Sequence, residues 1–277
     1  MRIVVVGGTG LVGAKLVRQL IAAGHETVVA ARSTGIDIVS GAGLDRALEG
    51  AEAVIDVSSP GYGDPDEMRA FFEAAGATLL AAGRAAGIGH HITFSAIGAE
   101  RIGEKNDPSC HIGDDRLVMP ASTTEMQDDV LPREAHRSGG YYRAKNAQEA
   151  MVTGAGIPFT IVRSAPLFEY IHDILYAGRT RGEVRVPPVR VQPIAADDAA
   201  RVLMQVALRD PANAVVEVAG PNIYALPDLA IQMLTGDEDY RPVLVEDGAV
   251  FFGAQLGEEA LISGVSRQPA EIQSERI

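Results

Sequence analysis

The sequence predicts an α/β protein built on a doubly wound parallel sheet, and two patterns indicate this fold class. Through the first 100 residues, short apolar runs rich in β-branched residues alternate with longer stretches of helical periodicity. A continuous apolar run such as residues 3–6 is typical of a strand that is buried on both faces of a sheet. Strands and helices that alternate at this spacing form right-handed βαβ units, whose helices cover both faces of a parallel sheet.

The individual elements follow from the local pattern. The first helix begins near Gly10, where the apolar residues change to helical spacing, and it ends at Gly24. A long alanine-rich helix, opened by Pro65, is expected over about 66–86, and another helix over about 140–153. In chain order, the predicted strands are 3–6, 27–31, 36–39, 53–57, 92–95 and 159–162.

The chain is expected to form two units. Residues 1–165 carry the strand–helix alternation and form the larger domain. Residues 166–277 mix short strands with helices and are expected to form a small α+β lobe over the carboxyl ends of the parallel strands. Residues 101–138 lack periodicity, so they are expected to be an insertion in the first domain that serves as a lid, a binding loop or a disordered segment.

Composition and charge exclude several classes of partner. The chain has 277 residues, a formal net charge of −13 and a sequence pI near 4.9. Such acidity disfavours nucleic acids and anionic membrane surfaces, and no apolar run approaches the roughly 18–20 residues that span a bilayer. Cys110 is the only cysteine, so no internal disulfide is possible. We therefore expect a cytoplasmic protein; the sequence leaves its oligomeric state open.

The glycine-rich segment Gly7-Gly8-Thr9-Gly10-Leu11-Val12-Gly13 lies directly between the first strand and the first helix. Glycines in this place allow a sharp turn and let the backbone approach a pyrophosphate, which the free N–H groups of the helix N-terminus bind. The segment therefore predicts a dinucleotide site. The alternative, a tight turn without a ligand, is less favoured because strand, turn and helix all fall where dinucleotide binding needs them.

The end of the second strand indicates which dinucleotide is bound. Folds that prefer NAD place an acidic residue there, which binds the ribose 2′-hydroxyl. Here the strand ends in Ala30-Ala31 and is followed by Arg32 and Ser33. A guanidinium suits a 2′-phosphate, and the serine hydroxyl adds a further donor. We therefore expect NADPH to be preferred over NADH, with a solvated surface arginine as the alternative interpretation of Arg32.

Tyr141 and Lys145 are spaced i and i+4 at the start of a predicted helix, so they project from one face. A tyrosine has an ordinary pKa near 10, and a nearby ammonium lowers it toward the range of a useful general acid. Such pairs also occur by chance on helix surfaces. Because this one follows a predicted nucleotide fold, we interpret Tyr141 as a proton donor and Lys145 as its partner.

These motifs, with Gly156-Ile157-Pro158-Phe159-Thr160-Ile161-Val162-Arg163, resemble the atypical short-chain dehydrogenases/reductases, and especially the NmrA-like NAD(P)H-binding proteins. The resemblance implies a Rossmann-type fold and a quinone or carbonyl reductase activity. It also implies that Lys145 holds the nicotinamide ribose, that Arg32 meets the adenosine phosphate and that Ser58 lines the adenine side. The residues that it implies for the pyrophosphate are Gly7, Thr9, Gly10, Leu11 and Val12.

The catalytic hydroxyl of such enzymes is expected just beyond the fifth strand. Ser95 is the candidate, although it also matches the cofactor-lining position, which would leave Ala96 or Ile97 at the catalytic one. Hydroxyls of the insertion, at residues 122–124, are possible substitutes. Phe168 follows the sixth strand and is expected either to wall the substrate pocket or to pack in the core.

Other polar residues are expected to be outside the chemistry. Cys110, His111, Asp114 and Asp115 lack a further ligand at metal-binding spacing, so we expect a solvated acidic loop and no metal. Asp56, within the fourth strand, is expected to be a hydrogen-bonded structural carboxylate.

The sequence thus predicts an NADPH-dependent oxidoreductase that transfers a hydride to a small carbonyl or quinone substrate. Two alternatives remain open. One is a non-catalytic NADP(H)-binding sensor, which the uncertain catalytic hydroxyl and the long insertion favour. The other is a sugar-nucleotide epimerase or dehydratase, which Arg32 disfavours because such enzymes usually place an acidic residue after the second strand.

Overall fold

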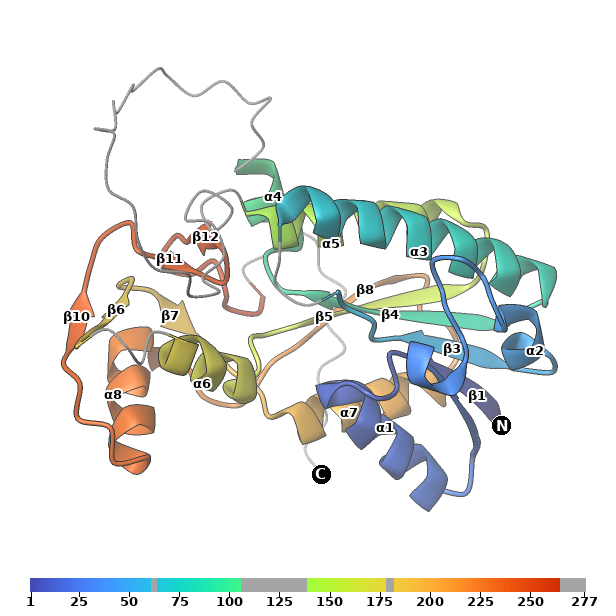
Figure 1. Ribbon diagram of the computed structural model, residues 1–277, viewed down its shortest axis with the longest axis horizontal. Helices are drawn as coiled ribbons and strands as arrows, with labels where there is room; N and C mark the ends of the chain where they lie inside the picture. The colour runs from blue at the N-terminus through green and yellow to red at the C-terminus, as the bar shows by residue number, and fades with distance from the viewer. Residues whose placement is uncertain (61–63, 106–138, 178–181, 265–277) are drawn as a thin grey trace.

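The computed structural model describes residues 1–60, 64–105, 139–177 and 182–264 (Figure 1). Its centre is a six-stranded sheet in the order β2-β1-β3-β4-β5-β8, and every neighbouring pair is parallel. This confirms the predicted fold class. The strands are β1 (Arg2–Val6), β2 (Glu26–Ala30), β3 (Ala53–Asp56), β4 (His90–Ala96), β5 (Phe159–Ser164) and β8 (Ala214–Val218).

Helices cover both faces of this sheet. On one face lie α1 (Leu11–Ala22) and α7 (Ala196–Ala207), and on the other lie α3 (Pro65–Ala85) and α5 (Gly140–Gly154) (Figure 1). Helix α1 buries Leu16 and Leu20 against β1, β3 and α7 in the largest apolar core. Val4 and Val6 project to the opposite face and pack against α3, so β1 is buried on both sides as its continuous apolar run predicts.

The strand order reverses at β1, which pairs with β2 on one side and β3 on the other. In doubly wound sheets, ligands bind in the crevice outside the carboxyl ends of the strands at such a point. The glycine-rich turn follows β1 and Ser58 lies just past the end of β3, so both lie at this crevice.

The strand predicted at 36–39 is wrong. After β2 the chain forms a single 3-10 turn (Arg32–Thr34), a loop and the short helix α2 (Leu44–Leu48). The Asp37 carboxylate accepts hydrogen bonds from the Val39 backbone N–H and the Ser40 hydroxyl. These local bonds close a turn, and they lower the pKa of Asp37 below its ordinary value. The apolar residue Ile38 is buried under α3 instead of in the sheet.

The C-terminal lobe lies beyond the carboxyl ends of β4 and β5 (Figure 1). It has its own apolar core between two helices and three small two-stranded sheets, β6–β10, β7–β9 and β11–β12. Its elements are α6 (Phe168–Ala177), β6 (Val184–Val186), β7 (Arg190–Val191), β9 (Tyr224–Ala225), α8 (Leu226–Gly236), β10 (Val243–Val245), β11 (Val250–Phe251) and β12 (Ala254–Gln255).

The single domain boundary predicted at residue 165 needs correction. After entering the lobe, the chain returns to the larger domain to form α7 and the sixth strand, β8, before it builds the rest of the lobe. The two units are therefore interleaved in sequence. The predicted insertion begins inside helix α4 (Ala99–Lys105), and residues 106–138 lie outside the described residues. Across the described ranges, no helix is both long and apolar enough to cross a membrane.

Candidate functional site

The turn after β1 is shaped by two glycines whose surroundings exclude a side chain. Gly7 has a φ of +77°, and a Cβ there would lie 2.9 Å from the Ser58 Cα. A Cβ on Gly13 would collide with the Gly7 carbonyl oxygen. Because these contacts hold α1 close to the ends of β1 and β3, the first N–H groups of α1 are presented at the crevice.

The residues expected to hold a pyrophosphate occupy this turn. Thr9 and Gly10 are exposed, and Gly10 is the N-cap of α1 without any side-chain cap. The Val12 side chain is buried in the core beside Leu11, so Val12 offers a ligand its backbone only. The Ser58 hydroxyl is buried and has no hydrogen-bond partner among the described residues. A helix N-terminus without a cap and an orphaned hydroxyl beside it fit an anionic dinucleotide.

Arg32 opens the 3-10 turn that directly follows β2, and both Arg32 and Ser33 are exposed. The Thr34 hydroxyl holds this turn, because it donates to the Val29 and Ala31 carbonyl oxygens and accepts from the Ala31 N–H. Among the described residues, the Arg32 side chain has no ion pair. Its guanidinium is therefore available to a phosphate at this edge of the crevice.

The Tyr141–Lys145 pair lies at the start of α5, a helix on the opposite face of the sheet from α1 (Figure 1). The helix begins after Gly139, which adopts a left-handed conformation (φ +61°) and donates its N–H to the Gly253 carbonyl. Lys145 is 3% exposed, and its Nζ donates to the Phe94 carbonyl (2.9 Å) and the Gln148 Oε1 (3.1 Å). Nζ also lies 4.3 Å from the centre of the Phe72 ring, a cation–π distance.

The pKa of Tyr141 differs from the sequence-based expectation. Burial, reinforced by Tyr170, raises the Tyr141 pKa above its ordinary value, although we expected a neighbouring ammonium to lower it. The Lys145 ammonium does not lower the Tyr141 pKa, because its Nζ is hydrogen-bonded to the Phe94 carbonyl and the Gln148 amide oxygen. Burial lowers the Lys145 pKa to about 8, against the opposing effects of Asp56 and Glu149. At neutral pH, Tyr141 is therefore a phenol and Lys145 is largely an ammonium.

A small cavity of about 40 Å³ opens beside Tyr141, at the carboxyl ends of β4 and β5. This space admits a few waters, and it is much smaller than a typical ligand pocket of about 300–1,000 Å³. Phe168 does not line it, because its ring packs edge-to-face on Tyr224 in the lobe core (6.3 Å between centroids). The lining residues are Phe94, Ser95, Ala96, Ile97, Tyr141, Tyr142, Ser164, Ala165, Pro166, Leu167, Tyr170, Phe252 and Leu261.

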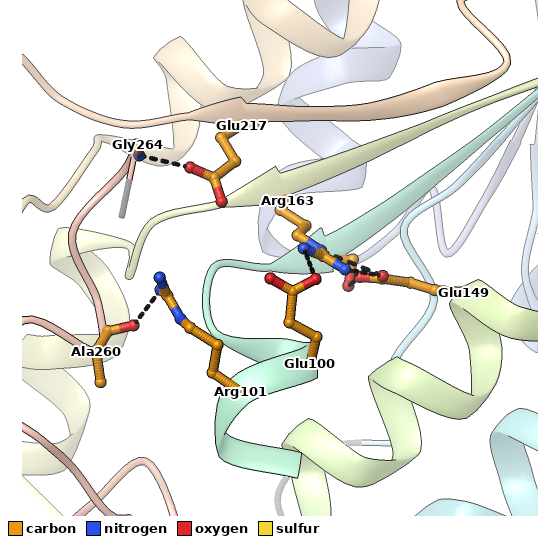
Figure 2. A network of polar contacts seen from close by, with 8 residues as sticks. Glu100, Arg101, Glu149, Arg163, Glu217, Ala260 and Gly264 are labelled. Carbon is orange, nitrogen blue, oxygen red and sulfur yellow. Dashed lines mark hydrogen bonds and ion pairs between the residues drawn. The ribbon is translucent and has the colours of Figure 1, made fainter. Parts of the chain in front are cut away.

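Ser95 lines this cavity, but its hydroxyl is bound to a buried ion cluster. It donates to the Glu149 Oε1 at 2.5 Å. Glu149 also binds Arg163, whose Nη2 lies 2.6 Å from the Glu149 Oε2 and whose Nη1 lies 2.6 Å from the Glu100 Oε2. Figure 2 shows Arg163 between these two carboxylates, one from α5 and one from α4. Because the Ser95 proton is directed to Glu149, Ser95 is not placed to hold a substrate carbonyl.

Sequence reasoning missed several members of the site. Tyr142, Phe252 and Leu261 line the cavity, and no local pattern marks them. Gln148, three residues after Lys145, binds both Lys145 and Asp56. An i to i+3 spacing from Lys145 is the sequence signal that would have suggested it. Asp56 is hydrogen-bonded, as we expected from the sequence.

No group of three or more metal-ligating side chains occurs in the part of the chain that the structure describes. The sequence around Cys110, His111, Asp114 and Asp115 lies outside it, as do residues 122–124.

Several solved structures with the same architecture are sugar-nucleotide enzymes. A dTDP-4-dehydrorhamnose reductase from Clostridium acetobutylicum matches with a TM-score of 0.65 and 18% identity, over 89% of this chain and 84% of that one. An NAD-dependent NDP-hexosamine 5,6-dehydratase, TunA, gives 0.63 and 20%, over 88% and 84%. A Thermus thermophilus UDP-glucose 4-epimerase in complex with NAD gives 0.62 and 17%, over 94% and 92%. The chain shares their fold.

Sequence comparison reaches a smaller part of the chain. No family model matches it. The photosystem II assembly factor Ycf39 of Synechocystis is 36% identical over an alignment of 113 residues, and the match covers 36% of this chain. The match covers 35% of the length of that curated relative.

Proposed function

We propose that the protein is an NADPH-dependent oxidoreductase of the short-chain dehydrogenase/reductase type, close to the NmrA-like branch, and that it reduces a carbonyl or quinone. One observation carries this proposal. Tyr141 lines a cavity at the sheet edge that also carries the glycine-rich turn after β1, and the Nζ of Lys145, one helical turn further along α5, donates to the carbonyl of the cavity-lining Phe94. The NAD dependence and the NAD complex stated for two of the similar structures support the dinucleotide part.

The residues at the crevice fit NADPH. Bound there, it supplies the hydride. The backbone N–H groups at the start of α1 would bind the pyrophosphate, and Arg32 would bind the 2′-phosphate. The Ser58 hydroxyl, which is buried without a partner among the described residues, would gain one. The Lys145 ammonium would bind the ribose hydroxyls of the nicotinamide half.

Tyr141 is proposed to hold and donate the proton that the reduced carbonyl oxygen takes up. The raised pKa of Tyr141 keeps its hydroxyl protonated at every physiological pH, so the phenol always carries the proton that it would donate. An alkoxide formed from a carbonyl is a much stronger base than a phenolate, so this proton transfer is downhill. Apolar side chains such as Phe252 and Leu261 line the same cavity.

A second candidate function, a non-catalytic NADP(H) sensor, is favoured by one observation. The Ser95 hydroxyl donates to Glu149, and the next two residues, Ala96 and Ile97, carry no hydroxyl. A carbonyl in the cavity would therefore lack the second donor that a catalytic serine provides. The sensor would bind the dinucleotide as the reductase does but would reduce no substrate.

The deciding experiment measures NADPH consumption against a panel of aldehydes, ketones and quinones. Wild type is compared with Tyr141→Phe and with Tyr240→Phe, a control that removes an exposed phenol which does not line this cavity. We expect Tyr141→Phe to lose about 100-fold or more in turnover while its affinity for NADPH stays unchanged. The control should keep most of the turnover.

Each other result has a defined meaning. Equal turnover in wild type and Tyr141→Phe would remove Tyr141 from the mechanism and would indicate direct hydride transfer, as to a quinone. Tight NADPH binding without turnover of any compound would favour the sensor. Release of NAD from the denatured purified protein would favour a sugar-nucleotide epimerase or dehydratase.

A further inference from the structure

A line of buried hydrogen bonds connects the end of β3 to Lys145. The Ser58 backbone N–H donates to the Asp56 Oδ1 at 2.9 Å. The Gln148 Nε2 donates to the other oxygen, Oδ2, at 2.9 Å, and the Gln148 Oε1 accepts from the Lys145 Nζ. Asp56, Gln148 and Lys145 are 4%, 3% and 3% exposed. The proposed adenine-side residue Ser58 is thus joined to the proposed ribose-binding lysine through two side chains.

The carboxylate of Asp56 determines which way the Gln148 amide points. A carboxylate only accepts hydrogen bonds, so it requires the Gln148 NH₂ group on its side. The amide oxygen then faces Lys145, where it accepts from the ammonium. An amide in place of Asp56 would be unable to accept from both Ser58 and Gln148, because one of its two ends is a donor. If Gln148 turned over to compensate, its NH₂ group would oppose the Lys145 ammonium.

We propose that Asp56, acting through Gln148, orients Lys145 and keeps its amine protonated, which makes Asp56 and Gln148 positioning residues of the proposed dinucleotide site. Their part in a reaction rests on the proposed function. Their effect on Lys145 is a property of the free protein and is measurable without any dinucleotide.

The charges around Lys145 single out Asp56 as the carboxylate that acts on it. On its own helix, Glu149 opposes the loss of the Lys145 proton, but Glu149 is already paired with Arg163 from β5. From α3, the neighbouring group is the uncharged Phe72 ring. From β4, His91 interacts with Asp56, and burial lowers the His91 pKa so that it is neutral at physiological pH.

The consequence concerns the working pH of the site. With Asp56 present, the Lys145 pKa is about 8, so the ammonium persists at neutral pH. Without the carboxylate, burial acts with less opposition, and the amine would lose its proton at a lower pH. A neutral amine binds the ribose and the nearby phosphates less tightly. As the pH is raised, affinity for NADPH should therefore begin to fall at a lower pH in a protein without the Asp56 charge than in wild type.

The chain is well suited to a direct test because it has only three lysines, Lys15, Lys105 and Lys145. Protein labelled with [ε-¹³C]lysine is titrated by NMR over about pH 6–11, and Lys145→Met assigns the buried signal. The variants are Asp56→Asn and Gln148→Met. Glu217→Gln is the matched control, because this carboxylate of β8 also accepts a backbone N–H, from Gly264 (Figure 2), and in the described part of the chain it is hydrogen-bonded to none of Ser58, Gln148 and Lys145.

We expect the Lys145 midpoint to fall by about one pH unit in Asp56→Asn and to stay at the wild-type value in Glu217→Gln. In Gln148→Met, which keeps the carboxylate, the midpoint should move less, while affinity for NADPH at pH 7 should fall by about tenfold, as expected for a lost charged hydrogen bond. An unchanged midpoint in folded Asp56→Asn would overturn the proposal. If that variant does not fold, unchanged NADPH affinity in Gln148→Met would overturn it.

The two proposals fail separately. A shifted midpoint in a protein that reduces no compound would support the role of Asp56 and would count against the oxidoreductase. Turnover that depends on Tyr141, with an unchanged Lys145 midpoint in Asp56→Asn, would support the oxidoreductase and would contradict the role of Asp56.

Discussion

Replacing Arg163 by methionine should destabilise the protein strongly, because it leaves the buried Glu149 carboxylate without the arginine that pairs with it. Arg163 is 6% exposed and binds Glu149 through Nε and Nη2 and Glu100 through Nη1. Removing one partner of a buried ion pair costs about 3–5 kcal/mol. Glu149 is 5% exposed and, among the described residues, its carboxylate keeps the Ser95 hydroxyl as a donor, whereas the Glu100 side chain is 35% exposed to solvent. We therefore expect a loss of about 3 kcal/mol, at the lower end of this range.

The assay is urea denaturation followed by circular dichroism, with the free energy of unfolding extrapolated to water. The double variant Glu149→Met/Arg163→Met removes both charges of the closest pair and should recover much of the loss. Arg185→Met is the matched control, because Arg185 pairs with two carboxylates on the surface of the lobe and should change the free energy of unfolding little. A loss below about 1 kcal/mol in Arg163→Met would refute the reasoning, since the cluster would then not behave as buried.

Three further predictions concern the site itself. Arg32→Ala should weaken NADPH about tenfold and leave NADH unchanged in calorimetric titrations, since only NADPH carries the 2′-phosphate; equal weakening of both would remove Arg32 from discrimination. Ser95→Ala should change kcat by less than about twofold and lower stability by about 1 kcal/mol, whereas a hundredfold fall in kcat would show that Ser95 is catalytic after all. Burial lowers the Lys145 pKa from 10.5 to about 8, so the unfolded chain binds this proton more tightly than the folded one. Between these pH values, stability should therefore rise with pH in wild type relative to Lys145→Met, by at most about 3 kcal/mol, and a constant difference would contradict the buried ammonium.

Features that depend on neighbouring residues in the chain were predictable from the sequence. The glycine-rich turn between a buried strand and a helix specifies its own geometry, and the structure has that turn at Gly7–Gly13. The i to i+4 spacing of Tyr141 and Lys145 needs only a helix to bring both to one face, and α5 is that helix. The parallel sheet followed from the alternation of strands and helices, because right-handed crossovers leave few other arrangements.

Features that depend on distant residues were not predictable in the same way. Phe252 and Leu261 reach the cavity from the last part of the lobe. Ser95 is diverted by Glu149, which lies 54 positions further along the chain. Tyr141 has a raised pKa because of how deeply it packs, which its sequence neighbours do not specify. The apolar pattern at residues 36–39 predicted a strand wrongly, because the hydrogen bonds of the Asp37 side chain favour a turn there.

The central claim is that the crevice beside Gly7–Gly13 and Arg32 binds NADPH, and isothermal titration calorimetry of the purified protein with NADPH and NADH tests it most directly. The account predicts one NADPH site per chain, with an affinity at least about tenfold above that for NADH, as expected for an added charged contact. Binding of neither dinucleotide, or tighter binding of NADH, would contradict it.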